Sequence, residues 1–262
     1  MTATASRKVW DPRVPAGHYR FTHAVQMEWI KLRSLRSTWM TLAVTGTGAV
    51  ALATTVGANT ENAAGDLTNN ALAGIVPGLL TIGVLGVLVM TGEYSSGAIR
   101  STLAAIPNRP LLLAAKAAVF AAVTLPLGEA AAFVAFFAGA AALPGAVPPP
   151  TLGQPGVLRA VVLSGVGISL IGLLGLGLGA IVRHTGAAVA VLVGGVFVGV
   201  QILAAAAPSA MGYLPISIVA NSLSVVDRQP GFLSPWAGLG VLCLYVAVTL
   251  GIGGGLFARR DA

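Results

Sequence analysis

The stretch GEYSSGAIRSTLAAIPNRP, residues 92–110, is a polar segment between two long apolar runs. It carries Glu93, Arg100 and Arg109 in a chain of 262 residues that is 56% hydrophobic and only 9% charged. A soluble domain has about one charged residue in four. We therefore expect the flanking runs to lie in lipid and the polar stretch to connect two membrane crossings.

Six apolar runs are long enough to cross a bilayer, which takes roughly 20 helical residues each. Backbone polar groups in lipid must be satisfied within the segment, so the runs predict helices, and the short alternating segments of a barrel are absent from the sequence. The runs are 39–57, 72–91, 111–143, 159–182, 187–207 and 236–257. The predicted fold class is all-α: a polytopic membrane protein with one six-helix domain over residues 39–262.

The positions of Lys and Arg predict the orientation, because basic residues collect on the cytoplasmic side. The residues on the predicted cytoplasmic side are Arg7, Lys8, Arg13, Arg20, Lys31, Arg33, Arg36, Arg100, Arg109, Lys116, Arg183, Arg259 and Arg260. Both termini are thus expected in the cytoplasm, residues 1–20 as a flexible segment, and the protein in the cell membrane. The net charge of +7 needs no nucleic-acid partner, since the basic residues are not interleaved with exposed aromatic residues.

Residues 21–38 predict an amphipathic connecting helix at the membrane surface. At 100° per residue its apolar face contains Phe21, Val25, Leu32, Leu35 and Trp39. Basic residues lie beside or away from this face, namely Lys31, Arg33 and Arg36. Glu28 lies within the face, where a lone carboxylate is costly. Two kinds of partner are equally expected for it: a base or a helix N-terminus from elsewhere in the chain, or Lys31 at i+3.

Two further features lie within or between the crossings. Residues 208–235 are long for a connection and half apolar, which predicts a re-entrant external segment.

Glu129 is the one ionisable residue well inside a crossing, in the run that also contains Pro126. An intramembrane carboxylate indicates a substrate or proton contact in a transport pathway, unless the long helix carries it to the outer interface.

The sequence lacks the motifs of the common catalytic sites. It contains no phosphate-binding Gly-x4-Gly-Lys-Ser/Thr loop, no His-Glu-x-x-His and no Gly-x-Ser-x-Gly. Its three histidines show no metal-ligand spacing, and Cys243 is a single cysteine within an apolar run. We therefore expect no catalysis by this chain and no metal or other cofactor bound directly to it.

Three stretches together resemble the membrane subunits of ATP-binding-cassette (ABC) transporters, in the six-helix, exporter-type permease family. They are MEWIKLRSLRSTW before the first crossing, GEYSSGAIRSTLAAIPNRPLLLAAK between the second and third, and LSPWAGLGVLCLYVAVTLGIGGGLFARRDA at the end. The resemblance implies a permease that exports a substrate and pairs with a second permease, identical or related. It also implies two cytoplasmic ATPase subunits, which would bind the ATP and Mg²⁺.

In that family the connecting helix and the loop after the second crossing form the ATPase docking surface. The resemblance then implies a role for each residue of the coupling loop 92–110. Glu93 anchors the turn out of the second crossing, Gly97 permits a close approach, Arg100, Thr102 and Leu103 lie on a short coupling helix, Pro107 ends it, and Arg109 and Lys116 mark the return to the headgroups. Locally, Ser95 or Ser96 is expected to cap that helix.

Other interpretations of the same residues remain open. Without the resemblance, residues 92–110 are an ordinary basic cytoplasmic loop. The chain as a whole has two alternatives, a secondary proton-coupled transporter that uses Glu129 and a membrane immunity or scaffold protein that transports nothing.

Overall fold

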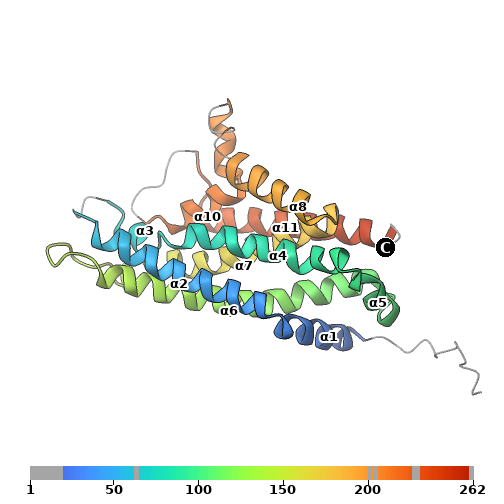
Figure 1. Ribbon diagram of the computed structural model, residues 1–262. Helices are drawn as coiled ribbons and strands as arrows, with labels where there is room; N and C mark the ends of the chain where they lie inside the picture. The colour runs from blue at the N-terminus through green and yellow to red at the C-terminus, as the bar shows by residue number, and fades with distance from the viewer. Residues whose placement is uncertain (1–19, 62–64, 200–201, 203–205, 226–230, 260–262) are drawn as a thin grey trace, which may run out of the picture.

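A computed structural model of the chain describes residues 20–61, 65–199, 202, 206–225 and 231–259, and within them all regular structure is helical. Five helices are long and apolar enough to cross a membrane: α2 (Arg36–Ala58), α4 (Ile75–Ser95), α6 (Arg109–Ala141), α7 (Val157–Val182) and α11 (Pro235–Arg259). They run side by side in one elongated bundle (Figure 1). The predicted all-helical fold class is confirmed, with five candidate crossings.

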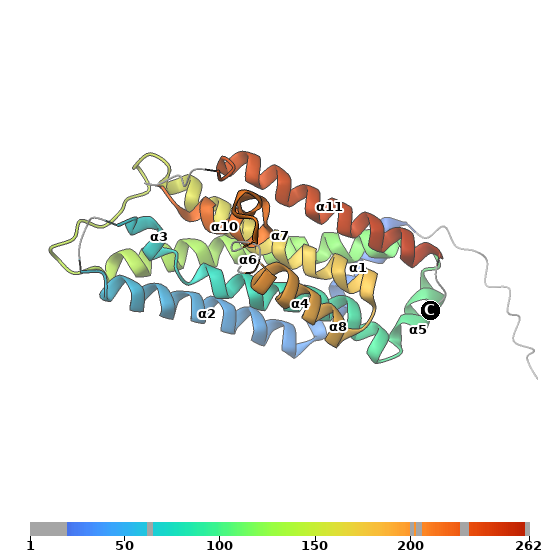
Figure 2. The same ribbon diagram turned by 90° about the horizontal axis from the view of Figure 1, so that it is seen from above.

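Shorter helices lie at the two ends of this bundle. Helices α1 (Phe21–Ser34) and α5 (Ala98–Ala105) lie at the end where α11 finishes, which we call the α5 end (Figures 1 and 2). Helix α3 (Leu67–Ala71) lies at the opposite end, the α3 end. The connecting and coupling segments of the sequence are therefore brought to the same end of the molecule.

The apolar run 187–207 differs from the other five. It forms α8 (Thr185–Val191) and then a π-helical segment, η1 (Leu192–Val198), which leaves the bundle at an angle (Figure 1). Residues 200–201 and 203–205 lie outside the described part of the chain. This run is therefore not among the five candidate crossings.

The segment expected to be re-entrant, 208–235, contains two short helices. These are η2 (Pro208–Tyr213) and α10 (Pro215–Leu223), and α10 packs on α7 and α11. Residues 226–230 lie outside the description, as does the expected N-terminal segment up to residue 19. Most residues of α10 are buried, as expected for a segment that is half apolar.

The connecting helix is shorter than the expected range 21–38. Helix α1 ends at Ser34, Leu35 is extended, and α2 starts at Arg36. Two side chains satisfy carbonyls at the end of α1: the Ser34 hydroxyl donates to the Lys31 oxygen (2.8 Å) and the Trp39 indole donates to the Arg33 oxygen (3.1 Å). The chain therefore turns from α1 into the first crossing without a connecting loop.

Helix α7 is the centre of the bundle and packs on α4, α6, α10 and α11. Its contact with α4 depends on glycine. A Cβ at Gly175 would overlap the carbonyl oxygen of Gly83, and a Cβ at Gly86 would overlap that of Gly172. The two backbones approach as closely as small residues permit, which is how membrane helices associate without a hydrophobic driving force.

This packing predicts the effect of a single methyl group. Gly175→Ala should lower the unfolding free energy by about 1–3 kcal/mol, because the added methyl forces α4 and α7 apart. Gly240→Ala is the matched control, since Gly240 on α11 has no atom within 4 Å of a Cβ position. Thermal unfolding of both variants in detergent measures the difference, and equal melting temperatures would contradict the packing described.

A carboxylate holds the α3 end together. Asp66 caps α3 by accepting from the Asn69 amide at 3.0 Å. Its other oxygen accepts from the Ser224 hydroxyl at 2.7 Å and the Val225 amide at 2.6 Å, just after α10. Arg159 of α7 donates to the Ser224 carbonyl at 3.0 Å. The end of α10 is thus fixed between α3 and the start of α7.

Candidate functional site

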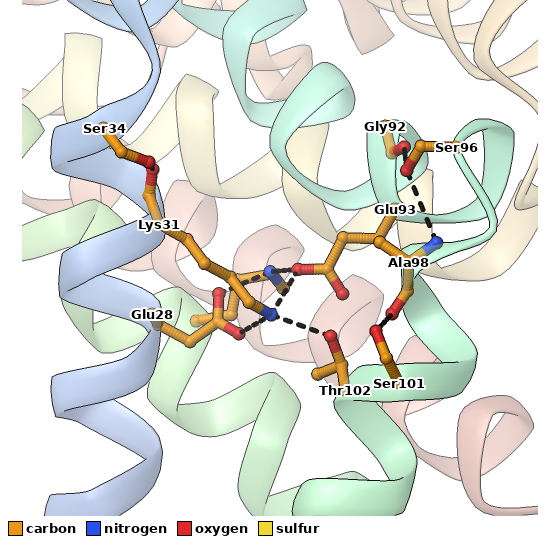
Figure 3. Close-up of polar contacts among 10 residues, drawn as sticks. Glu28, Lys31, Ser34, Gly92, Glu93, Ser96, Ala98, Ser101 and Thr102 are labelled. Atoms are coloured by element: carbon orange, nitrogen blue, oxygen red, sulfur yellow. Dashed lines mark hydrogen bonds and ion pairs between the residues drawn. The ribbon is translucent and has the colours of Figure 1, made fainter.

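Four helices meet at the α5 end through four charged side chains and one threonine hydroxyl. The residues are Glu28 and Lys31 of α1, Glu93 of α4, Thr102 of α5 and Lys116 of α6, and we call them the ion network (Figure 3). All five come from segments that the sequence analysis singled out. The helices that carry them are far apart in the chain, since Glu28 and Lys116 are separated by 88 positions.

The two ammonium groups each bridge both carboxylates. Lys116 Nζ lies 2.5 Å from Glu28 Oε2 and 2.6 Å from Glu93 Oε1. Lys31 Nζ lies 3.0 Å from Glu28 Oε1 and 3.0 Å from Glu93 Oε1, and donates to the Thr102 hydroxyl at 2.9 Å. The side chains of Glu28 and Lys116 are 4% exposed, that of Glu93 12% and that of Lys31 33%.

This arrangement is electrically balanced, with two positive and two negative groups in alternation. Buried charges are retained in proteins when they are paired and hydrogen-bonded, and removal of one partner is strongly unfavourable. Both partners expected for Glu28 are present, the distant base Lys116 and the neighbour Lys31. The ion pairs therefore fix how α1 sits against the long helices α4 and α6, and the hydrogen bond from Lys31 to Thr102 attaches α5 to them.

The buried face of α1 differs from the expected one. Ala24, Glu28 and Leu32 face inward at i, i+4 and i+8, against α6. Phe21, Leu35 and Trp39, expected on the same apolar face as Leu32, are 45%, 49% and 42% exposed. Packing against α6 thus selects the narrow stripe that carries the carboxylate, and leaves the large apolar groups at the surface.

Helix α5 is a short helix with defined ends. Gly97 is its N-cap, with a φ of 72°, a left-handed conformation that favours glycine. The N-cap position is therefore glycine and not the expected serine, but the Ser96 hydroxyl, which donates to the Gly92 carbonyl, also accepts from the Ala98 amide at the start of α5 at 3.5 Å (Figure 3). The helix ends at Ala105, and Ile106 is extended because it precedes Pro107.

The two faces of α5 differ. Ile99 and Thr102 are buried and face the bundle, Leu103 is half-buried, and Arg100 and Pro107 are exposed. Arg33 and Arg36 of the connecting segment are exposed too. The structure therefore separates the predicted residues into an inner set, which forms the ion network, and an outer set of arginines on the surface.

Lys116, expected to mark the return of the chain to the headgroups, is a buried residue. It is 3% exposed and forms the centre of the ion network. The apolar stretch around it, LLLAAKAAVF, was the signal that it would be buried. A lysine one turn or more inside an apolar helix needs a carboxylate, and Glu28 was a carboxylate for which a base from elsewhere in the chain was one of the expected partners.

A second basic cluster holds the end of α11. Arg109, the first residue of α6, donates to the Phe257 carbonyl at 3.1 Å, and Arg183, which ends α7 with a φ of 60°, donates to the Leu256 carbonyl at 3.0 Å. The Arg183 guanidinium also lies 5.4 Å from the centre of the Tyr94 ring. Cations at a helix C-terminus are stabilising. The role of Arg183 was not predicted from the sequence.

Glu129 lies away from the ion network, on α6. It is half-buried against Gly165 of α7, where a Cβ would come within 2.6 Å of Glu129 Cδ. Gly165 is about two turns, or about 12 Å, along α7 from Val157. The carboxylate is therefore inside the bundle's length and not at the end of the long helix.

The described residues include no group of three or more His, Cys, Asp and Glu side chains placed to hold a metal ion. With its five long apolar helices, the chain belongs to the class of multi-pass helical membrane proteins. Comparison with protein-family models and with curated proteins finds no match.

Proposed function

We propose that this chain is the permease subunit of an ABC transporter, and that α1 and α5 form the surface on which the ATPase docks. The observation that supports this most is the ion network. It joins α1 to the long helices α4 and α6 through ion pairs, and it joins α5 to α1 through the hydrogen bond from Lys31 to Thr102. A displacement of α5 reaches the ion pairs through the hydrogen bond from Lys31 to Thr102 (2.9 Å), and it reaches α4 directly because only Ser96 and Gly97 separate the two helices.

The outer face of α5 is suited to bind a partner. Arg100 and Ser101 are exposed on a helix whose inner face is fixed by Ile99 and Thr102, and Pro107 is exposed just after it. Such a helix can transmit force, since its contacts to the bundle and its contacts to a partner lie on opposite faces. Arg33 and Arg36 add positive charge at the same end.

The proposal includes the arrangement in the membrane. The α5 end is cytoplasmic, α1 lies at the interface with its exposed aromatic residues in the headgroup zone, and the run 187–207 supplies a sixth crossing. Two such permeases, identical or related, surround a pathway, and two ATPase subunits bind ATP and Mg²⁺. Their closure moves the permeases as rigid bodies and exports the substrate.

Affinity purification tests this directly. The tagged protein, extracted from its own cells in mild detergent, should retain an ABC ATPase, and the purified complex should hydrolyse ATP. Retention of other proteins but no ATPase would contradict the proposal. The gene encoding the ATPase is expected beside this one.

Glu129 supports one alternative, proton-coupled transport without an ATPase. Its position inside the bundle is the specific observation in favour. In that case Glu129→Gln abolishes transport, and ATP depletion in the presence of an imposed proton gradient does not. We expect the opposite result for an ABC permease: transport that requires ATP in both the wild type and Glu129→Gln. A membrane immunity or scaffold protein would show no transport in either assay.

A further inference from the structure

A cavity of about 390 Å³ lies beside the ion network, between α1, α4 and α6. Its polar side includes Lys31, Glu93 and Ser96, and its apolar side includes Leu32, Leu88 and Val119. One cavity thus combines charged groups with a hydrocarbon wall, as a site for an amphiphilic molecule requires.

The hydrogen bonds of the network leave one acceptor unused. An ammonium group has three hydrogens, and those of Lys31 are directed to Glu28, Glu93 and Thr102. Both lysines reach Glu93 through Oε1. Glu93 Oε2 is buried and has no donor among the residues that the structure describes. A buried carboxylate oxygen without a donor is costly, so the site favours a ligand that supplies one.

The cavity is open on the apolar side. Leu35 and Leu88, which line it, are 49% and 44% exposed. Leu88 belongs to the candidate crossing α4, more than one turn from Glu93 toward the middle of the helix. A molecule that enters past Leu88 comes from the lipid, with its polar group at Glu93 and its chain along α4.

We propose that this cavity binds a phospholipid with a primary amine in its headgroup, such as phosphatidylethanolamine, whose ammonium donates to Glu93 Oε2. The charges favour this class. The zwitterionic headgroup adds no net charge to a balanced network, and its phosphate can lie toward Lys31, the most exposed of the four charged groups. A choline headgroup has no N–H to donate. The inference is independent of any ATPase.

A series of lipids with equal acyl chains tests the donor. Binding to the purified full-length protein is measured by native mass spectrometry for phosphatidylethanolamine, its N-methyl and N,N-dimethyl derivatives, and phosphatidylcholine. We expect small losses for the first two methyl groups and a loss of about tenfold at the third, which removes the last N–H. Equal binding of all four, or equal binding of phosphatidylglycerol, would overturn the proposal.

Variants locate the site without touching the ion network. Leu88→Trp places a larger side chain at the apolar opening of the cavity and should remove the preference for phosphatidylethanolamine over phosphatidylcholine. Leu244→Trp is the control, because Leu244 is also lipid-exposed, at 61%, but lies on α11. Both positions are at the surface, so both variants should fold. An unchanged preference in Leu88→Trp would place the lipid elsewhere and contradict the assignment.

Discussion

Lys116→Met is expected to lower the unfolding free energy by about 3–5 kcal/mol, the largest effect that we predict for a single substitution. Lys116 is buried and bridges Glu28 and Glu93, so its loss leaves two carboxylates and one ammonium in a site with little water. Methionine keeps most of the side-chain volume of lysine. The loss of unfolding free energy therefore comes from the removed charge and not from an empty cavity. Reversible unfolding of the purified protein in mixed micelles measures it.

The double variant Glu28→Gln with Lys116→Met separates the ion pair from general damage. It removes one charge of each sign and leaves Lys31 paired with Glu93. We expect the double variant to be more stable than Lys116→Met alone and to regain most of the unfolding free energy that Lys116→Met loses. The difference from the sum of the two single losses is the coupling energy between the two positions. Strictly additive losses would show that the two side chains do not interact, contrary to the contact at 2.5 Å.

Arg100→Glu is expected to weaken capture of the ATPase at least about tenfold, without loss of stability. Arg100 is exposed on the outer face of α5, so its reversal leaves the ion network and the fold intact. If Arg100 faces a negative group of the partner, glutamate at this position replaces attraction between the two surfaces by repulsion. Titration of the copurified ATPase against the purified variant in lipid nanodiscs gives the affinity.

The control for this reversal is Arg259→Glu. Arg259 is exposed at the same end of the bundle but belongs to α11, so it changes the net charge equally. A difference between the two variants assigns the effect to α5 and not to the electrostatic potential of the whole surface. Equal affinities for Arg100→Glu and the wild type would remove α5 from the docking surface.

The fold was predictable where the signal is local. Continuous apolar sequence predicts long helices in lipid, and five of the runs are long helices close to the expected positions. The short helix α5 was also accessible, since a glycine and a proline with fixed backbone preferences, Gly97 and Pro107, bound it. In each case the physical cause lies within a few residues of its effect.

The ion network was only partly predictable, because its partners are distant in sequence. The sequence marked Glu28 as a carboxylate in need of a base, but no periodicity could say that the base is Lys116. Likewise, the buried stripe of α1 depends on which face meets α6, and Leu35 and Trp39 are therefore exposed against expectation. Hydropathy also does not tell whether a helix bonds i to i+4 or i to i+5. The π-helical segment η1 within the run 187–207 was therefore not predicted.

The most direct measurement of the central claim is photo-crosslinking from α5 in native membranes. A photoreactive amino acid is placed at Ser101, which is exposed beside Arg100, and in a second strain at Asn59, which is exposed at the end of α2 near the α3 end. The proposal predicts an adduct between position 101 and an ABC ATPase, and none from position 59. A folded protein whose position 101 yields no ATPase adduct, or whose position 59 does, would contradict it.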